Sequence, residues 1–282
     1  MSAQENELLK TLRGSMSRNE FFASLCILAC ANGVGVRIIQ SVNQLGWAEA
    51  VFSSFEISVI VFIACAAGVS FILRDSTDEI RPVDFVVGAV SLVLVVLPIV
   101  ALSWLALTAL SLHMLLFTSA TSSRRRGAVI ILTTTVPMLW SRLFFECFSN
   151  FILKIDALLV GWLLGTDRVG NMVRFADGSE ILAIFPACSS FANMSLAFLC
   201  WVTISQWVQH RWSPWDILWC LLVFTSVVAI NVARLSLMGL SDWHYQTIHH
   251  SQWGELLPNI IMSGLVVGIS VLGVRRELFS RI

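Results

Sequence analysis

Charged residues are scarce in this sequence. Aspartate, glutamate, lysine and arginine make up 13% of its 282 residues, whereas soluble globular proteins carry about 25%. Apolar residues make up 57%, and several apolar runs reach the roughly 20 residues that a helix needs to cross a bilayer. The composition excludes an ordinary soluble enzyme and predicts an all-α polytopic membrane protein. The net charge of zero gives no indication of a nucleic-acid partner.

The seven cysteines lack the spacings that mark disulfide frameworks or zinc modules, because no CxxC pair and no histidine partner set occurs. We therefore expect no metal and no other cofactor. Cys188 stands where a polar segment gives way to an apolar run, and a thiol beside a helix N-terminus is favoured as thiolate. Most of the others fall inside apolar runs, where cysteine usually packs as a small hydrophobe: Cys26, Cys30, Cys65, Cys200 and Cys220.

Internal repeats and low-complexity linkers are also missing. The economical interpretation is one integral membrane domain over residues 1–282. Within it, an N-terminal part of four spans covers 1–126, and a part covering 127–282 carries the cysteine, arginine and histidine motifs discussed below.

Apolar runs predict about eight spans. The first run lacks a small-x-small cleavage site, so we expect it to remain as a span. Residues 146–164 mix Glu146, Lys154 and Asp156 with apolar side chains, which is typical of an amphipathic helix lying in the membrane interface. The spans are expected at about 21–36, 49–73, 83–98, 102–120, 128–145, 189–208, 216–238 and 256–274.

Basic residues predict the orientation of these spans. With the N-terminus in the cytoplasm, the inner loops hold most of the lysine and arginine, as the positive-inside rule requires. This orientation places both termini in the cytoplasm and Cys188 on the outer face. The basic residues left outside are Arg37, Lys154, Arg168 and Arg174.

The longest outer segment covers residues 165–186 and leads directly to Cys188. It carries the pair Asp177-Gly178 between two short β-prone runs. An Asp-Gly pair in this setting favours a tight turn, so we expect a short extracytoplasmic β-hairpin.

Two arginines, Arg142 and Arg234, fall inside predicted spans. A charge there costs about 2.5–3.5 kcal/mol on insertion scales, so it usually has a function. Arg234 follows Asp216 by about 18 residues, or about 27 Å of helix, which places it at the depth of Cys188. A snorkelling anchor is the alternative for Arg234. For Arg142, an intrahelical pair with Glu146 is favoured.

The predicted outer loop before the last span holds three of the five histidines, His244, His249 and His250. Histidine has a pKa suited to deprotonating a thiol, and an arginine would stabilise a developing oxyanion. Cys188, Arg234 and a loop histidine therefore suit thiol acyl transfer. Metal binding is an alternative, although the spacing matches no zinc motif. An interfacial histidine cluster without chemistry is another.

Three motifs occur in order in the C-terminal half. Ala187-Cys188-Ser189 precedes a span, Asn231-x-x-Arg234 lies late in the next, and His250-x-x-x-Gly254 precedes the last. This order resembles the exosortase/archaeosortase family of multi-spanning prokaryotic membrane cysteine enzymes, over about residues 140–274. The resemblance implies that Cys188 is the nucleophile and that Arg234 and His250 are its catalytic partners.

The resemblance also marks supporting residues. His249 is an alternative to His250 as the base, and Asn231 and Ser189 belong to the arginine and cysteine motifs. One position departs from the family, which usually has glycine where this chain has Ser190. The departure indicates a divergent subfamily and leaves the recognised sorting motif open.

Family membership would imply a membrane-embedded cysteine protease/transpeptidase of the bacterial inner (plasma) membrane. Its partners would be secreted precursor proteins with a C-terminal motif, a transmembrane helix and a basic tail, cleaved through a thioester at the outer face. Besides these it would contact only the lipid bilayer, with no cofactor and no nucleic acid. The acceptor stays open between water, an amine and a glycolipid.

Two other classes of protein remain as alternatives. In a transporter or permease, Arg142 and Arg234 would bind an anionic substrate, although the sequence shows no repeated pair of Gly/Pro-broken spans. A non-catalytic membrane assembly factor that retains an inactive triad is the other, and the Ser190 departure is compatible with it.

Overall fold

The computed structural model describes residues 16–52, 57–74, 79–97, 99–119, 121–249 and 252–275. The chain is mostly helical, and several of its helices are long and apolar, which marks a membrane-embedded protein. By length and composition, three helical runs among the described residues are able to cross a membrane: Arg18–Leu45, Ser123–Leu164 and Trp215–Met238. Shorter apolar helices accompany them: Val59–Leu73, Pro82–Val96, Val100–Leu116 and Leu257–Gly273.

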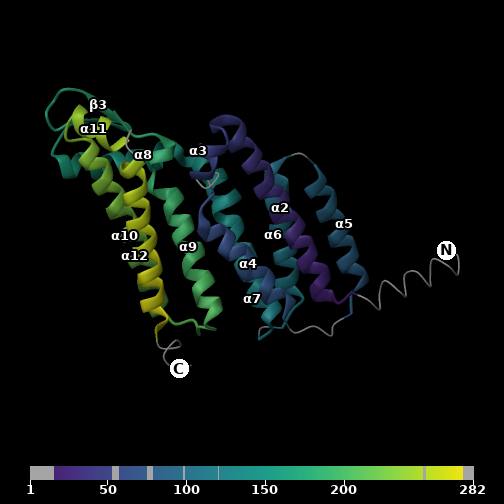
Figure 1. Ribbon diagram of the computed structural model, residues 1–282. Coiled ribbons are helices and arrows are strands. Elements are labelled where there is room, and N and C mark those ends of the chain that lie inside the picture. The colour runs from purple at the N-terminus through teal and green to yellow at the C-terminus, as the bar shows by residue number, and fades with distance from the viewer. Residues whose placement is uncertain are drawn as a thin grey trace, which may run out of the picture. The chain divides into compact units, whose positions relative to one another are not determined.

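The chain divides into two compact units, Met1–Leu139 and Trp140–Ile282. The sequence suggested a division at residue 126, which lies inside a helix of the N-terminal unit. In that unit α2, α4, α5, α6 and α7 pack alongside one another (Figure 1). Its helices are α2 (Arg18–Leu45), α3 (Trp47–Phe52), α4 (Val59–Leu73), α5 (Pro82–Val96), α6 (Val100–Leu116) and α7 (Ser123–Thr135).

Glycines bring α4 and α7 into close contact. A Cβ added to Gly127 would lie 2.5 Å from the carbonyl oxygen of Gly68, and one added to Gly68 would lie 2.7 Å from the Ile131 side chain. Small residues at such crossings let helix backbones approach closely, which is how helices associate in a lipid environment.

A buried ionic network joins helix ends in the N-terminal unit. Arg18 begins α2, and its Nε and Nη2 donate to the two carboxylate oxygens of Asp84, at 2.7 and 2.9 Å. Asp84 lies in the first turn of α5 and also contacts Nε2 of His113, in the last turn of α6, at 2.8 Å. Arg18 is 2% exposed and Asp84 0%. Such a pair is tolerated only because each charge has a partner.

Two segments of this unit differ from the sequence expectation. The run 49–73 contains two helices, α3 and α4, because Ser58 caps a new helix by accepting from the backbone N–H of Ile60 at 3.3 Å. Arg124 falls between the predicted spans 102–120 and 128–145, so the sequence predicts that it lies in a loop. It lies in the first turn of α7, where it is buried and its Nε donates to Oδ1 of Asn19.

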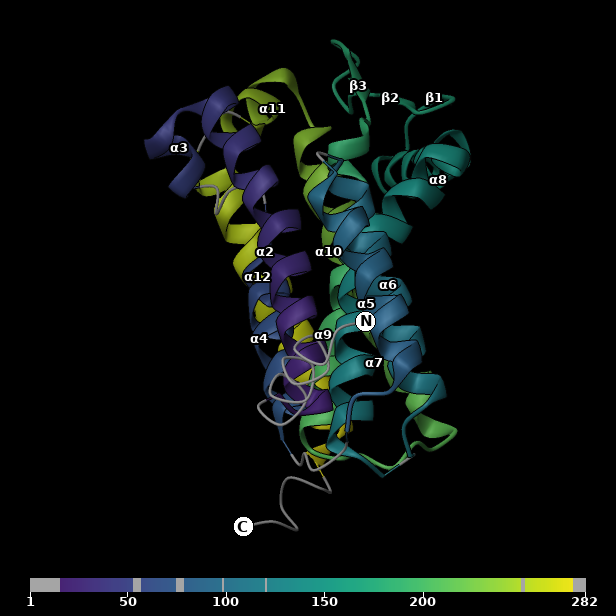
Figure 2. The ribbon, with the colours of Figure 1, turned by 90° about the vertical axis from the view of Figure 1, so that its right-hand side faces the viewer.

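The C-terminal unit combines helices with a small antiparallel sheet. Its helices α9, α10 and α12 lie side by side, and the sheet and α11 lie together at one end of them (Figures 1 and 2). Its elements are α8 (Ser141–Leu164), β1 (Arg168–Val169), β2 (Met172–Arg174), β3 (Ile181–Ala183), the 3₁₀ helix η3 (Pro186–Cys188), α9 (Ser190–Trp207), α10 (Trp215–Met238), α11 (Asp242–His249) and α12 (Gln252–Gly273).

Helix α8 has no break at residue 145, where the sequence suggested the end of a span. A π-helical turn, η2 (Val136–Trp140), connects it to α7. Pro137 lies in this turn, and a π turn accommodates a residue that cannot donate a backbone hydrogen bond. Figure 1 shows α8 crossing the ends of α9 and α10 beside the sheet.

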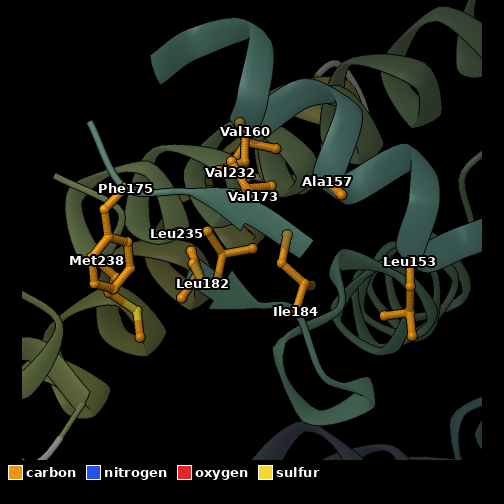
Figure 3. Close-up of a cluster of buried hydrophobic side chains, with 10 residues drawn as sticks. All are labelled: Leu153, Ala157, Val160, Val173, Phe175, Leu182, Ile184, Val232, Leu235 and Met238. Carbon is orange, nitrogen blue, oxygen red and sulfur yellow. The ribbon is translucent and has the colours of Figure 1, made fainter. Parts of the chain in front are cut away.

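One hydrophobic cluster connects α8, the sheet and α10. The register pairs Val173 of β2 with Leu182 of β3, and both side chains are buried while their strand neighbours Met172 and Ile181 are exposed. This alternation gives the sheet one inward face. The cluster, drawn in Figure 3, comprises Leu153, Ala157, Val160, Val173, Phe175, Leu182, Ile184, Val232, Leu235 and Met238.

Candidate functional site

Cys188 is held by the chain that leaves the sheet. The backbone N–H of Ile184 donates to the carbonyl of Asn171, and the side-chain amide of Asn171 donates back to the carbonyl of Ile184, both at 3.0 Å. The 3₁₀ turn η3 follows, in which the N–H of Cys188 donates to the carbonyl of Phe185 at 2.9 Å. The Cys188 side chain is half-buried and packs against the hydrophobic cluster.

Asp156 of α8 anchors the residues directly after Cys188. One carboxylate oxygen accepts from the hydroxyl of Ser189 at 2.9 Å, and the other accepts from the hydroxyl of Ser190 at 2.8 Å. The backbone N–H of Ser190 also donates to Asp156, at 3.3 Å. All three residues are buried. A buried carboxylate with this many donors is satisfied and orders the start of α9.

Side-chain acceptors occupy the start of the helix that follows Cys188. Ser189 is the N-cap of α9, and its hydroxyl accepts from the N–H of Phe191 at 3.3 Å. The first N–H groups of α9 are therefore taken by Ser189 and Asp156. The Asp156 carboxylate also complements the positive end of the helix dipole. Cys188 precedes the N-cap, and the N–H groups of Ser190 and Phe191 donate to Asp156 and Ser189.

Asn231 links the arginine motif to the cysteine motif. Its side-chain amide donates to the backbone carbonyl of Cys188 at 2.8 Å and to the hydroxyl of Ser190 at 3.0 Å. Arg234 lies on α10 three residues later, on the same side of the helix. Its Nε is buried, and no described residue accepts a hydrogen bond from it. Cys188, Ser189 and Asn231 are thus brought together, with Arg234 one turn away on the helix that carries Asn231.

Helix α11 (Asp242–His249), which carries His244, packs on the sheet and on the end of α10. The N–H of Ala176 donates to the carbonyl of Gly239 at 2.9 Å, and the rings of Phe175 and Tyr245 lie 6.3 Å apart. Helix α11, which ends at His249, is therefore attached to the same cluster as Cys188. His250 lies outside the described residues.

His244 has a local role in α11. Its Nδ1 contacts the hydroxyl of Ser241 at 2.8 Å. The nearby β2–β3 turn contains Gly178 at φ +75°. There the hydroxyl and N–H of Ser179 hold the pKa of Asp177 below its usual range, with a smaller contribution from the charge of His244. His244 is thus hydrogen-bonded within its own helix, whereas the side chain of His249 lies outside the described part of the chain, as His250 does.

A pocket of about 660 Å³ lies beside the cysteine segment. Pro186 and Phe191 flank Cys188 in the chain and line one side, and α8 lines the other with Arg142 and Glu146. Contrary to the sequence expectation, no ion pair joins Arg142 to Glu146 in the described part of the chain. Both side chains are exposed. The volume is typical of a ligand site, which ranges from about 300 to 1,000 Å³.

Metal ligands do not gather among the residues that the structure describes, where no group of three His, Cys, Asp or Glu side chains could hold an ion. The chain matches no family model, no curated protein and no solved structure.

Sequence reasoning missed the part played by Asp156 and Ser190. A signal for Asp156 was present, because Leu153, Asp156, Ala157 and Val160 share one face of α8 and the other three are buried and apolar. A carboxylate on such a face requires buried donors. The hydroxyl of Ser190 joins two helices, since it donates to Asp156 of α8 and accepts from Asn231 of α10.

Replacing Asp156 with alanine is expected to loosen the cysteine segment. Three donor groups of Ser189 and Ser190 lose their acceptor, and each buried unsatisfied group costs about 1–3 kcal/mol. Alkylation of Cys188 by a maleimide should accelerate by about tenfold or more, because 1.4 kcal/mol of local opening is a factor of ten. The measurement uses a Cys147→Ala background, which removes an exposed competing thiol. Asp167→Ala, at an exposed carboxylate, is the control, and equal labelling rates in both variants would contradict the role of Asp156.

Proposed function

We propose that this protein is a membrane-embedded cysteine protease/transpeptidase that cleaves C-terminal sorting signals of secreted proteins. One observation carries the proposal. Asn231, in the motif that contains Arg234, donates a hydrogen bond to the backbone carbonyl of Cys188. Two motifs 43 residues apart in the chain therefore meet at the backbone of the cysteine that the sequence singles out.

The proposed reaction begins with proton transfer from the Cys188 thiol to a histidine, His250 or its neighbour His249. The thiolate sulfur attacks the scissile carbonyl carbon, and a C–S bond forms. The C–N bond then breaks, and the histidine returns the proton to the leaving amine. Water or an acceptor amine next attacks the thioester and gives a proton to the histidine. The C–S bond breaks, and the histidine passes this proton to the Cys188 thiolate.

Arg234 is the proposed oxyanion stabiliser. The backbone N–H of Cys188 is engaged by Phe185, so it does not serve as a free donor to the tetrahedral intermediate. The buried Nε of Arg234, by contrast, has no acceptor among the described residues. A charged donor that is already positioned in a site of low polarity stabilises the transition state most when the oxyanion forms within hydrogen-bond distance of it.

The pocket beside Cys188 suits the residues that flank the scissile bond. Its walls combine the Phe191 ring, stacked on Phe144 at 5.4 Å between ring centroids, with the opposite charges of Arg142 and Glu146. A short peptide motif with apolar and polar side chains fits this lining. The substrate's transmembrane helix would lie in the bilayer, and its basic tail at the far side.

Helix α8 is the proposed interfacial element. Its exposed apolar side chains recur every three or four residues, which gives one continuous stripe along the helix. A helix of this kind lies in the membrane surface with its stripe in the acyl region. This position would hold the β2–β3 turn and Cys188 at the outer face, with both termini in the cytoplasm and about eight spans in all. The stripe comprises Phe144, Phe148, Phe151, Ile155, Leu158 and Trp162.

A panel of alanine variants tests the proposed roles. In vesicles that contain a secreted precursor with a C-terminal motif, an apolar helix and a basic tail, wild-type protein should release the tail. Arg234→Ala should slow release by about 10²–10³-fold, as loss of an oxyanion donor does. Loss of the base should slow it by about 10²–10⁴-fold, and comparison of His249→Ala with His250→Ala identifies that base.

His244→Ala is the matched control, because the ring of His244 is hydrogen-bonded to the Ser241 hydroxyl. It should retain processing within a few-fold. A normal rate in Arg234→Ala and in a protein that lacks both His249 and His250 would contradict the proposed mechanism.

A further inference from the structure

A second pocket lies at the opposite end of α9 from Cys188. Helix α9 has 18 residues, so its two ends are separated by about 27 Å. The pocket, of about 330 Å³, is bounded by the turn that follows α9, the start of α10 and the end of α12. It is therefore physically separate from the proposed catalytic region.

The turn between α9 and α10 has a defined geometry. Gln209 adopts a left-handed backbone conformation at φ 55°, which ends α9 as a helix cap does. The N–H of His210 then donates to the carbonyl of Ser205 at 3.0 Å. These contacts place His210 and Arg211 together on the pocket wall.

The acidic residue in the pocket lining, Asp216, already has hydrogen-bond partners within the α9–α10 turn. Asp216 is 4% exposed, and its two carboxylate oxygens lie 2.9 and 3.0 Å from Nε2 of His210. The backbone N–H of Ser213 also donates to it, at 2.7 Å. The carboxylate therefore stabilises the α9–α10 connection and the start of α10, and its oxygens are not available to a ligand.

Two exposed guanidinium groups give the pocket its charge. Arg211 and Arg275 both line it, and neither has an ion-pair partner in the described ranges. Gly273 lets the end of α12 approach Trp201 and Trp219 closely. A Cβ at this position would lie 2.4 Å from the Trp201 ring and 3.2 Å from Trp219. Close approach of α12 to its neighbours thus holds Arg275 near the α9–α10 turn.

The surroundings indicate an amphiphilic ligand. Trp215 lines the pocket and is 70% exposed, and Leu272, also in the lining, is 50% exposed. Exposed tryptophan is typical of the level of lipid headgroups, and the helices beyond it expose leucine and isoleucine. Basic pockets between membrane helices recognise anionic headgroups. We infer that this pocket binds the phosphate of an anionic phospholipid headgroup, with the acyl chains along α10 and α12.

Lipid binding by the full chain in detergent micelles, followed by native mass spectrometry, tests this site. Phosphatidylglycerol should bind more tightly than phosphatidylcholine. The Arg211→Gln/Arg275→Gln variant should bind phosphatidylglycerol about thirtyfold more weakly, since each arginine near an anionic surface contributes about 1 kcal/mol and 1.4 kcal/mol is tenfold. Arg211→Lys/Arg275→Lys should retain most of the affinity, because it keeps both charges.

Arg168→Gln/Arg174→Gln removes the same charge from the sheet at the other end of the unit and should bind like wild type.

Competition with inorganic phosphate separates the two sources of the anion. Displacement of the lipid would show that free phosphate also occupies the site, and persistence would show a requirement for the lipid. Equal affinity for the two lipids, or an unchanged affinity in the glutamine variant, would overturn the inference. Precursor processing does not enter this measurement, so its outcome is independent of the proposed catalysis.

Discussion

The Cys188→Ala variant is expected to release no tail from the precursor above the uncatalysed background. The proposed thioester needs the sulfur of Cys188, and no other group in the mechanism forms the covalent bond. Loss of a nucleophile that acts with a base and an oxyanion donor costs at least about 10³-fold in rate. The measurement is precursor cleavage in vesicles, together with detection of a thioester adduct by mass spectrometry and its release by hydroxylamine.

Cys147→Ala is the matched control for this experiment. Cys147 is also a free cysteine, it lies on α8 within the same unit, and it is exposed. Its removal should leave both cleavage and the adduct unchanged. Normal processing by Cys188→Ala would exclude thiol catalysis and favour the permease or assembly alternatives. Normal processing by the wild type with an adduct on another cysteine would exclude Cys188 in particular.

The Asp84→Ala variant is expected to lose about 3–5 kcal/mol of unfolding free energy. The change leaves Arg18 buried without its carboxylate partner and removes the contact to His113. Breaking a buried ion pair from one side carries a cost of this size, because the remaining charge has no water to solvate it. Denaturant-induced unfolding in mild detergent, followed by tryptophan fluorescence, measures the change.

Two further variants show whether the loss comes from the unpaired charge. Glu79→Gln removes an exposed acidic charge in the same unit and should change stability by no more than about 0.5 kcal/mol. Arg18→Leu/Asp84→Leu removes both partners and should recover a large part of the stability, since apolar replacement of a whole pair is often neutral. A double variant as unstable as Asp84→Ala would contradict this account.

The pairing in the ionic network of Arg18, Asp84 and His113 could not be predicted from the sequence. Arg18 and Asp84 are separated by 66 residues. In the sequence Arg18 stands before the first predicted span and Asp84 at the start of the predicted span 83–98, and nothing there pairs them. The positive-inside count treats Arg18 and Arg124 only as orientation signals. Their burial depends on which helix ends meet, and that is a property of the packed bundle.

The helices themselves were largely predictable. The run 216–238 corresponds to α10 (Trp215–Met238), and the run 83–98 to α5 (Pro82–Val96). The ends are local features, because Pro82 suits the first helical position and Gly239 follows the last residue of α10. The run 128–145 was less predictable. A proline inside it suggests a boundary, but the π turn at Val136–Trp140 lets the helix continue into α8.

Several properties of this protein follow from its sequence alone. A mostly helical, membrane-embedded chain is implied by long apolar runs, since the transfer of apolar side chains out of water depends on composition and not on their partners. The position of Cys188 between a polar segment and an apolar run is likewise a local feature. The tertiary structure decided that Asn231 reaches the carbonyl of Cys188 and that Asp156 accepts from the first backbone N–H of α9, that of Ser190. Hydrogen bonds of this kind require donors and acceptors within about 3 Å, and only the packing of α8, α9 and α10 brings such distant residues to that separation.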